Sequence, residues 1–199
     1  MPNKEIPLLP QRERLGEGSR TPSRVPVLIA GAGPCGLGLA IELGLRGVQC
    51  LVIEQSDEPI QFPTANLINT RTMEFLRRWG IADEARLHSG FPADYPNNYL
   101  YLTSFNGHEL ARFEHAANGD PAARSPFSPE GPIWCPKFFF DPVLRRKVKS
   151  LPGVGLRFNR RLESFRQSSE CVTAELVDTV TGRREQITAE YLAGCDGPG

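Results

Sequence analysis

Residues 25–54, VPVLIAGAGPCGLGLAIELGLRGVQCLVIE, predict a strand, a helix and a second strand in immediate succession. The apolar run 25–30 has the length of a buried strand, and a second apolar run follows at 48–53. Between them, residues 34–47 repeat apolar side chains at helical spacing. Proline opens this segment, where its missing N–H is harmless, and glycine closes it. A unit of this kind indicates parallel strands joined by a right-handed crossover.

Gly31, Gly33 and Gly36 lie between the first strand and the helix in the pattern G-x-G-x-x-G. In dinucleotide-binding folds these positions provide a tight turn, close approach of the backbone to a pyrophosphate, and close packing of helix on strand. The helix start also offers free N–H groups to phosphates. Glu54 ends the second strand at the distance expected for an acid that binds an adenosine ribose and would repel a 2′-phosphate. The pattern predicts a site for FAD or NAD and disfavours NADP in this pocket.

The remainder of the chain mixes helices with antiparallel hairpins. We expect helices at 71–79 and 138–150, a hairpin over 99–113 with its turn at Asn106-Gly107, and a second hairpin at the end of the chain. That second hairpin pairs 171–177 with 186–192 across a turn at Thr181-Gly182. Residues 116–136 are expected to form a loop. The aromatic stretches 95–101 and 134–140 are interpreted as core rather than as the lining of a substrate cavity. The predicted fold class is α/β, a Rossmann-like FAD/NAD(P)-binding domain with an antiparallel β insertion, incomplete at its C-terminus.

Composition excludes several classes of function. The 23 basic and 23 acidic residues cancel, which argues against nucleic-acid and anionic-membrane partners. No apolar run approaches the ~18 residues of a membrane span, and the N-terminus lacks the apolar stretch of a secretory signal. The five cysteines show no Cys-x-x-Cys and the three histidines no metal-ligand spacing, so we expect reduced thiols, a cytoplasmic location and no metal. Residues 1–23 are expected to be a disordered tail.

Four quoted segments carry a resemblance to a known family. They are GAGPCGLGLAIELGLRG at 31–47, VIEQ at 52–55, NTRTMEFLRRWGI at 69–81 and AGCDG at 193–197. In this order they resemble the aromatic-hydroxylase family of single-component flavoprotein monooxygenases, to which the para-hydroxybenzoate and phenol hydroxylases belong. The resemblance selects FAD over NAD for the glycine motif.

The resemblance also implies roles for individual residues. Gly31, Gly33 and Gly36 would hold the FAD pyrophosphate, and Glu54 the adenosine ribose. Arg71 begins a helix that lies beside the flavin in such proteins; it either reaches a phosphate or is an exposed helix residue. Asp196 matches an Asp-Gly motif near the cofactor that is also tied to the pyridine nucleotide, unless it belongs to an ordinary turn.

Two positions depart from the family pattern. Thr64 stands where many relatives have a basic residue, and Lys137 where many have Gln. These departures affect the finer cofactor contacts and leave the strand–helix–strand unit unchanged.

The implied function is an FAD-dependent monooxygenase that uses NAD(P)H and dioxygen to hydroxylate a small aromatic, phenolic substrate. The implied FAD-binding domain covers 24–199, with the start of a substrate-domain insertion at about 91–185. The family's second flavin motif is expected beyond Gly199, so we expect a truncated form. No catalytic acid or base is assigned, and the oligomeric state stays open. The alternatives are a catalytically inactive FAD-binding remnant and an NAD-dependent dehydrogenase that uses the same glycine loop.

Overall fold

The computed structural model describes residues 24–57, 65–124 and 126–197. The expectations for residues 1–23 and for Thr64 lie outside the described residues. The chain divides into two compact units, of which unit 1 comprises residues 1–57 with 148–199 and unit 2 comprises residues 58–147.

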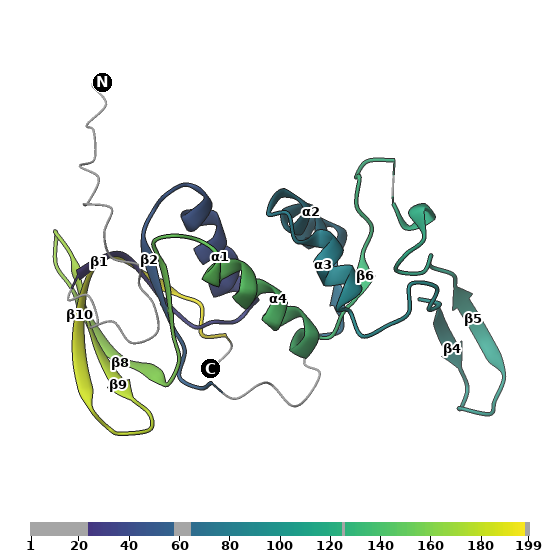
Figure 1. Cartoon of the computed structure of the whole chain (residues 1–199). Helices are drawn as coiled ribbons and strands as arrows, with labels where there is room; N and C mark the ends of the chain where they lie inside the picture. Colours follow the sequence, from purple (N-terminus) through teal and green to yellow (C-terminus); the bar gives the residue numbers. More distant parts are fainter. Residues whose placement is uncertain (1–23, 58–64, 125, 198–199) are drawn as a thin grey trace. The chain divides into compact units, whose positions relative to one another are not determined.

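Unit 1 is built on one mixed sheet (Figure 1). Its elements are β1 (Arg24–Ala30), α1 (Pro34–Leu45), β2 (Cys50–Ile53), β7 (Val154–Arg157), β8 (Arg160–Gln167), β9 (Val172–Asp178) and β10 (Arg184–Gly194). The six strands follow the order β7-β2-β1-β10-β9-β8. β7, β2, β1 and β10 are parallel neighbours, whereas β9 pairs antiparallel with both β10 and β8.

The predicted strand–helix–strand unit is confirmed. β1 and β2 pair in parallel with Val27 opposite Cys50, and α1 contacts β1, β2 and β7. Leu37 and Ile41, one helical turn apart on α1, are both fully buried. All four residues of β2 are buried as well, as expected for a parallel strand that is covered on both faces.

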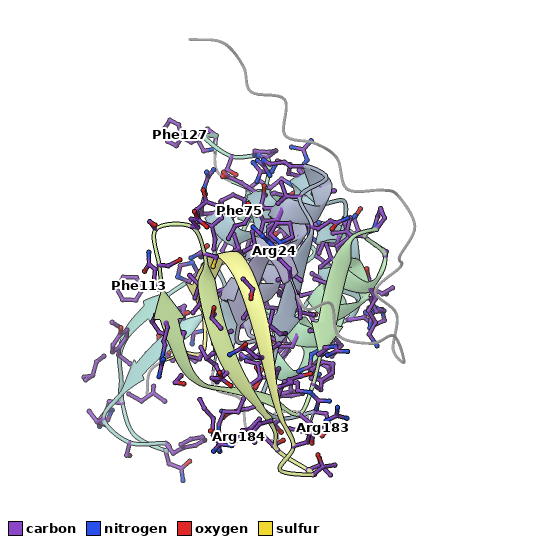
Figure 2. All side chains as sticks on the ribbon, turned by 90° about the vertical axis from the view of Figure 1, so that its left-hand side faces the viewer. Arg24, Phe75, Phe113, Phe127, Arg183 and Arg184 are labelled. Carbon is purple, nitrogen blue, oxygen red and sulfur yellow. The ribbon has the colours of Figure 1, made fainter. Side chains whose placement is uncertain are left out.

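Buried side chains from four strands of the sheet form a second part of the core in unit 1. Leu28 on β1 and Leu51 on β2 belong to one buried cluster with Leu176 of β9 and Ile187 of β10. The β9–β10 hairpin that brings the last two together was predicted from its turn at Thr181-Gly182, and the antiparallel pairing of Ala174 with Ile187 confirms it. Figure 2 shows Arg183 and Arg184 at this turn.

Burial of Cys50 makes unit 1 sensitive to alkaline pH. Desolvation raises the pKa of its thiol from 9.0 to about 11. Above pH 9 the unfolded chain releases this proton while the folded chain keeps it, so stability is lost as pH rises toward 11. We expect the free energy of unfolding, measured by urea and far-ultraviolet circular dichroism, to fall more steeply in this range for the natural protein than for Cys50→Ala. If the free energy of unfolding fell equally with pH in the two proteins, the Cys50 thiol would not be the cause of the loss.

Unit 2 combines short helices with two small sheets. Its elements are β3 (Leu67–Ile68), α2 (Thr70–Arg78), α3 (Ala82–Leu87), β4 (Tyr99–Leu102), β5 (Glu109–Phe113), the 3-10 turn η1 (Pro121–Ala123), β6 (Ile133–Trp134) and α4 (Lys137–Lys149), whose last residues lie in unit 1. The helix predicted at 71–79 forms with its start one residue earlier, at Thr70, where the Asn69 side chain caps it by accepting a 2.8 Å hydrogen bond from the Thr72 N–H. Gly80, with φ +75°, follows the end of α2.

Residues 116–136 are not entirely a loop, contrary to the prediction. β6 pairs antiparallel with β3, placing Leu67 opposite Trp134. Asn118 supports this pair, because its side chain accepts from the Trp134 N–H at 2.8 Å and donates to the Trp134 carbonyl at 3.0 Å. Strands of two residues are too short to show an alternating pattern, so this sheet leaves no signal in the sequence.

The interpretation of residues 95–101 as core is wrong for Tyr95, Tyr99 and Tyr101, whose side chains are exposed. The predicted hairpin forms, with Tyr99 opposite Phe113, but every residue of β4 and β5 is exposed. Figure 2 shows the exposed Phe113, whose ring contacts the Tyr101 ring of the same hairpin at 5.8 Å between ring centres. A two-stranded hairpin can bury its side chains only where another layer covers it, and Asn106-Gly107 predicts the turn without predicting a cover.

Within the described ranges, no helix is long and apolar enough to cross a membrane. The same residues contain no group of three or more His, Cys, Asp or Glu side chains arranged to hold a metal ion.

Candidate cofactor-binding site

Gly31 makes the turn that leads from β1 into α1. Its φ of +106° favours glycine, and its N–H donates to the Ile53 carbonyl at 2.8 Å. A Cβ at this position would lie 2.3 Å from the carbonyl oxygen of Cys195. The turn therefore lies directly on the end of β10, which leaves no room for any side chain.

Gly36 allows the start of α1 to close onto the same turn. A Cβ on Gly36 would lie 2.0 Å from the Gly31 carbonyl oxygen and 3.3 Å from the Cβ of Cys195. The first and third glycines of the motif are thus required by contacts inside the protein.

Gly33 differs from both neighbours in the motif. It has extended backbone, with φ −76° and ψ −179°, and a Cβ built on it would meet no protein atom within 4 Å. Packing within the described residues therefore does not require glycine here. The open space fits the remaining role of the motif, in which the backbone is approached by a phosphate.

The first turn of α1 supplies hydrogen-bond donors beside this space. The helix begins at Pro34, and the Leu37 N–H closes its first turn on the Gly33 carbonyl at 2.9 Å. The N–H groups of Cys35 and Gly36 precede that bond, where a helix provides no internal partner. Together with the positive end of the helix dipole they form a site suited to a pyrophosphate.

Glu54 is tied to the glycine loop, residues 31–36. Its Oε2 accepts a 2.8 Å hydrogen bond from the Ala32 N–H. The backbone of Glu54 is fixed on both sides, because its N–H donates to the Arg157 carbonyl at 2.9 Å and its carbonyl accepts from the Arg160 N–H at 2.8 Å. A carboxylate offers about four acceptor positions, so the half-buried Glu54 can also accept from ribose hydroxyls.

Two contacts that sequence reasoning missed hold the segment after Glu54. Asn159, between β7 and β8, donates to Asp57 at 3.1 Å, and Thr179, between β9 and β10, donates to the Gln55 carbonyl at 3.0 Å. Asn159 has φ +56°, a conformation that Asn tolerates better than most residues. These contacts span more than 100 positions of the chain, and no local pattern identifies them.

Asp196 follows β10 at the same edge of the sheet. The Cys195 N–H donates to the Ala30 carbonyl at 2.7 Å, which holds the end of β10 beside the end of β1. Asp196 is exposed, and its N–H group lies next to Gly31. Unit 1 thus brings together the three glycines, Glu54 and Asp196.

Comparison with known protein families shows which family of dinucleotide-binding proteins the chain belongs to. Residues 24–199 match the model of the FAD binding domain family. The chain belongs to this family. FAD is therefore the cofactor that the site is built for, and the resemblance to flavin-dependent aromatic hydroxylases is confirmed.

Two curated relatives of this FAD-binding chain are monooxygenases. It is 32% identical over 187 residues to tetracenomycin B2 monooxygenase-dioxygenase of Streptomyces olivaceus, covering 87% of this chain and 34% of that protein. It is 29% identical over 174 residues to phenol 2-monooxygenase of Pseudomonas sp. (strain EST1001), covering 86% and 28%. The chain thus spans about a third of the length of these curated relatives.

Solved structures share the fold. The rebeccamycin biosynthetic enzyme RebC with reduced flavin is 37% identical, with a TM-score of 0.80 over 89% of this chain and 33% of that one. The flavin-dependent monooxygenase PieE, in complex with FAD and substrate, is 33% identical, with a TM-score of 0.76 over 87% of this chain and 30% of that one. An α/β FAD-binding fold with a mixed sheet is shown for this chain.

Arg71 and Lys137 belong to unit 2. The Arg71 guanidinium is exposed, pairs with Glu74 at 2.7 Å and lies 4.6 Å from the centre of the Phe75 ring. The hydrogen bond from Arg71 is the main cause that lowers the pKa of Glu74. Lys137 pairs with Asp141 one helical turn further along α4. Both cations therefore already have carboxylate partners within unit 2.

Proposed function

We propose that this chain is the FAD-binding part of a monooxygenase that uses NAD(P)H and dioxygen to hydroxylate a small phenolic substrate. The observation that carries the proposal is the open backbone at Gly33, beside the first turn of α1, with Glu54 bonded to the neighbouring Ala32. Protein packing leaves this position free in a loop that is otherwise tightly packed.

The proposed roles follow from the donors and acceptors in unit 1. The Gly33 backbone and the first-turn N–H groups of α1 bind the pyrophosphate, while Gly31 and Gly36 allow the loop to close. Glu54 accepts hydrogen bonds from the adenosine ribose, and Asp196 lies near the cofactor. Arg71 places its positive charge near a phosphate, and to do so it gives up its ion pair with Glu74. FAD supplies the redox chemistry when bound, and the protein binds and orients it.

Relatives support the finer parts of the proposal. Phenol 2-monooxygenase and 3-(3-hydroxy-phenyl)propionate/3-hydroxycinnamic acid hydroxylase are named for phenolic compounds, which supports a phenolic substrate here. We further propose an FAD-binding domain over 24–199, in which about 91–185 begins a substrate-binding insertion with antiparallel strands, and a cytoplasmic location. Relatives named as monooxygenases or hydroxylases favour neither an NAD-dependent dehydrogenase nor an inactive remnant.

The test is the visible spectrum of the purified protein after incubation with FAD and desalting. Retained flavin absorbance near ~450 nm is the expected result, because that is where the bound cofactor absorbs. NADH and a panel of phenols would then be assayed for coupled oxidation and hydroxylation. A colourless protein that leaves all added FAD in the flow-through would overturn the proposal.

Glu54→Gln is expected to weaken FAD binding by about tenfold, or ~1.4 kcal/mol. The amide can still accept from the Ala32 N–H, so the loop is retained, but its hydrogen bond to a ribose hydroxyl loses the assistance of the charge. Titration of flavin fluorescence measures the change. Glu190→Gln is the matched control, because Glu190 is exposed on β10. Equal losses in the two variants would show that net charge, rather than a contact, controls binding.

A further inference from the structure

Cys35 and Cys195 lie on the two segments that meet at the glycine loop. Cys35 is exposed in the first turn of α1, and Cys195 is half-buried directly after β10. The residue next to Cys35, Gly36, lies so close that a Cβ on it would be 3.3 Å from the Cβ of Cys195. The other cysteines differ: Cys50 and Cys135 are buried, and Cys171 lies directly before β9, beside Ser168.

The two thiols also interact through their charges. Burial is the first cause that raises the pKa of Cys195, and the neighbouring Cys35 is the second, ahead of Asp196. From the contact at Gly36, the Cα atoms of Cys35 and Cys195 are at most about 10 Å apart. A disulfide requires about 4.4–6.8 Å between Cα atoms; where the separation exceeds this range, the first turn of α1 must move toward the end of β10 for the link to form.

We propose that Cys35 and Cys195 form an oxidation site, at which hydrogen peroxide links the two thiols in a disulfide that closes the pyrophosphate site. The second part rests on the proposed function, since it assumes that FAD phosphates bind at this turn. A disulfide would hold the first turn of α1 against the end of β10. The N–H groups of that turn would then be drawn away from the open space at Gly33.

The exposed thiol reacts first. The Cys35 thiolate attacks one peroxide oxygen, the O–O bond breaks and hydroxide leaves, so that Cys35 becomes a sulfenic acid. This product is neutral, and its formation removes the Cys35 charge that opposes ionisation of Cys195. The Cys195 thiolate then attacks the Cys35 sulfur and the second hydroxide leaves. In total two thiols lose two electrons and two protons, and one peroxide becomes two water molecules.

Tryptic mapping tests the linkage independently of FAD. Cleavage at Arg24, Arg46 and Arg184 releases peptides 25–46 and 185–199, each with a single cysteine. After treatment of the reduced protein with hydrogen peroxide, we expect these two peptides to appear joined, with a mass about 2 Da below their sum. Oxygen addition at Cys35 without a link, or a link to another cysteine, would overturn the proposal.

Flavin retention tests the consequence. We expect peroxide to lower the FAD retained after desalting by at least about tenfold, and dithiothreitol to restore it. Cys35→Ser and Cys195→Ser should each remove the response, compared with their own untreated samples, and Cys171→Ser should keep it. A disulfide that leaves FAD retention unchanged would overturn the closure. Failure of the untreated protein to bind FAD would overturn the proposed function alone, because the peptide link is read by mass.

Discussion

Replacing Gly33 by alanine is expected to weaken FAD binding by about a hundredfold, or ~2.7 kcal/mol, while the protein keeps its stability. The new methyl group would meet no protein atom within 4 Å, and φ of −76° is ordinary for alanine. The same methyl would occupy the space at which the backbone approaches the pyrophosphate. Hydrogen bonds to charged groups contribute about 1.5–3 kcal/mol each, so displacement of one phosphate oxygen accounts for the expected loss.

Gly31→Ala serves as the opposite case in the same loop. Its Cβ would collide with the Cys195 carbonyl at 2.3 Å, and φ of +106° strains any residue with a side chain. We expect the free energy of unfolding to fall by about 3 kcal/mol or more, since backbone strain alone costs about 1–3 kcal/mol. Urea unfolding followed by far-ultraviolet circular dichroism measures this change, and flavin fluorescence measures binding.

Gly182→Ala separates strain from collision. Gly182 has a φ of +73° with no atom within 4 Å of a built Cβ, and it lies in the β9–β10 turn. It should lose only about 1 kcal/mol. If Gly31→Ala were as stable as Gly182→Ala, or if Gly33→Ala bound FAD like the natural protein, this account of the glycine loop would be wrong.

The glycine loop also shows how much the sequence can predict. The strand and the helix follow from local spacing, because the turn and the helix start involve neighbours in the chain, and the roles proposed for the three glycines are predicted from the same spacing. The partner that makes Gly31 necessary does not follow, since Cys195 is more than 160 positions away and reaches the loop only through the pairing of β10 with β1. Glu54 was predictable as an acid at a strand end, but its bond to Ala32 was not.

Burial in unit 2 was less predictable than its secondary structure. Asn106-Gly107 predicts a turn between the two strands, yet whether Tyr99 and Tyr101 are buried depends on what packs against the hairpin. Glu130 is the opposite case: it lies in a stretch rich in Pro and Gly, where a glutamate is usually exposed to solvent, but it is only 4% exposed. In both cases burial is a property of tertiary contacts, which alternation and turn residues do not encode.

A second large effect, on the stability of unit 2, is expected when the buried Glu130 loses its ion-pair partner. Its carboxylate is paired with the Arg86 guanidinium and lies 3.7 Å from Nε of Arg77, whose side chain is mostly exposed. Arg86→Met retains the aliphatic packing of the arginine but removes the charge that neutralises Glu130. Breaking a buried pair from one side costs about 3–5 kcal/mol, because the buried carboxylate then keeps only its longer contact with the mostly exposed Arg77. We expect unit 2 to lose stability by this amount.

Tryptophan fluorescence provides the readout, because the chain has two tryptophans, Trp79 and Trp134, and both lie in unit 2. Arg112→Met is the matched control: Arg112 pairs with Glu109 at 2.7 Å, but both side chains are exposed by more than 40%, so its loss should stay within about 1 kcal/mol. Adding Glu130→Leu to Arg86→Met should recover much of the stability, since no buried charge is then left unpaired. If Arg86→Met cost no more than Arg112→Met, the Glu130 pair would contribute no more than a surface ion pair, and burial of the carboxylate would not determine the stability of unit 2.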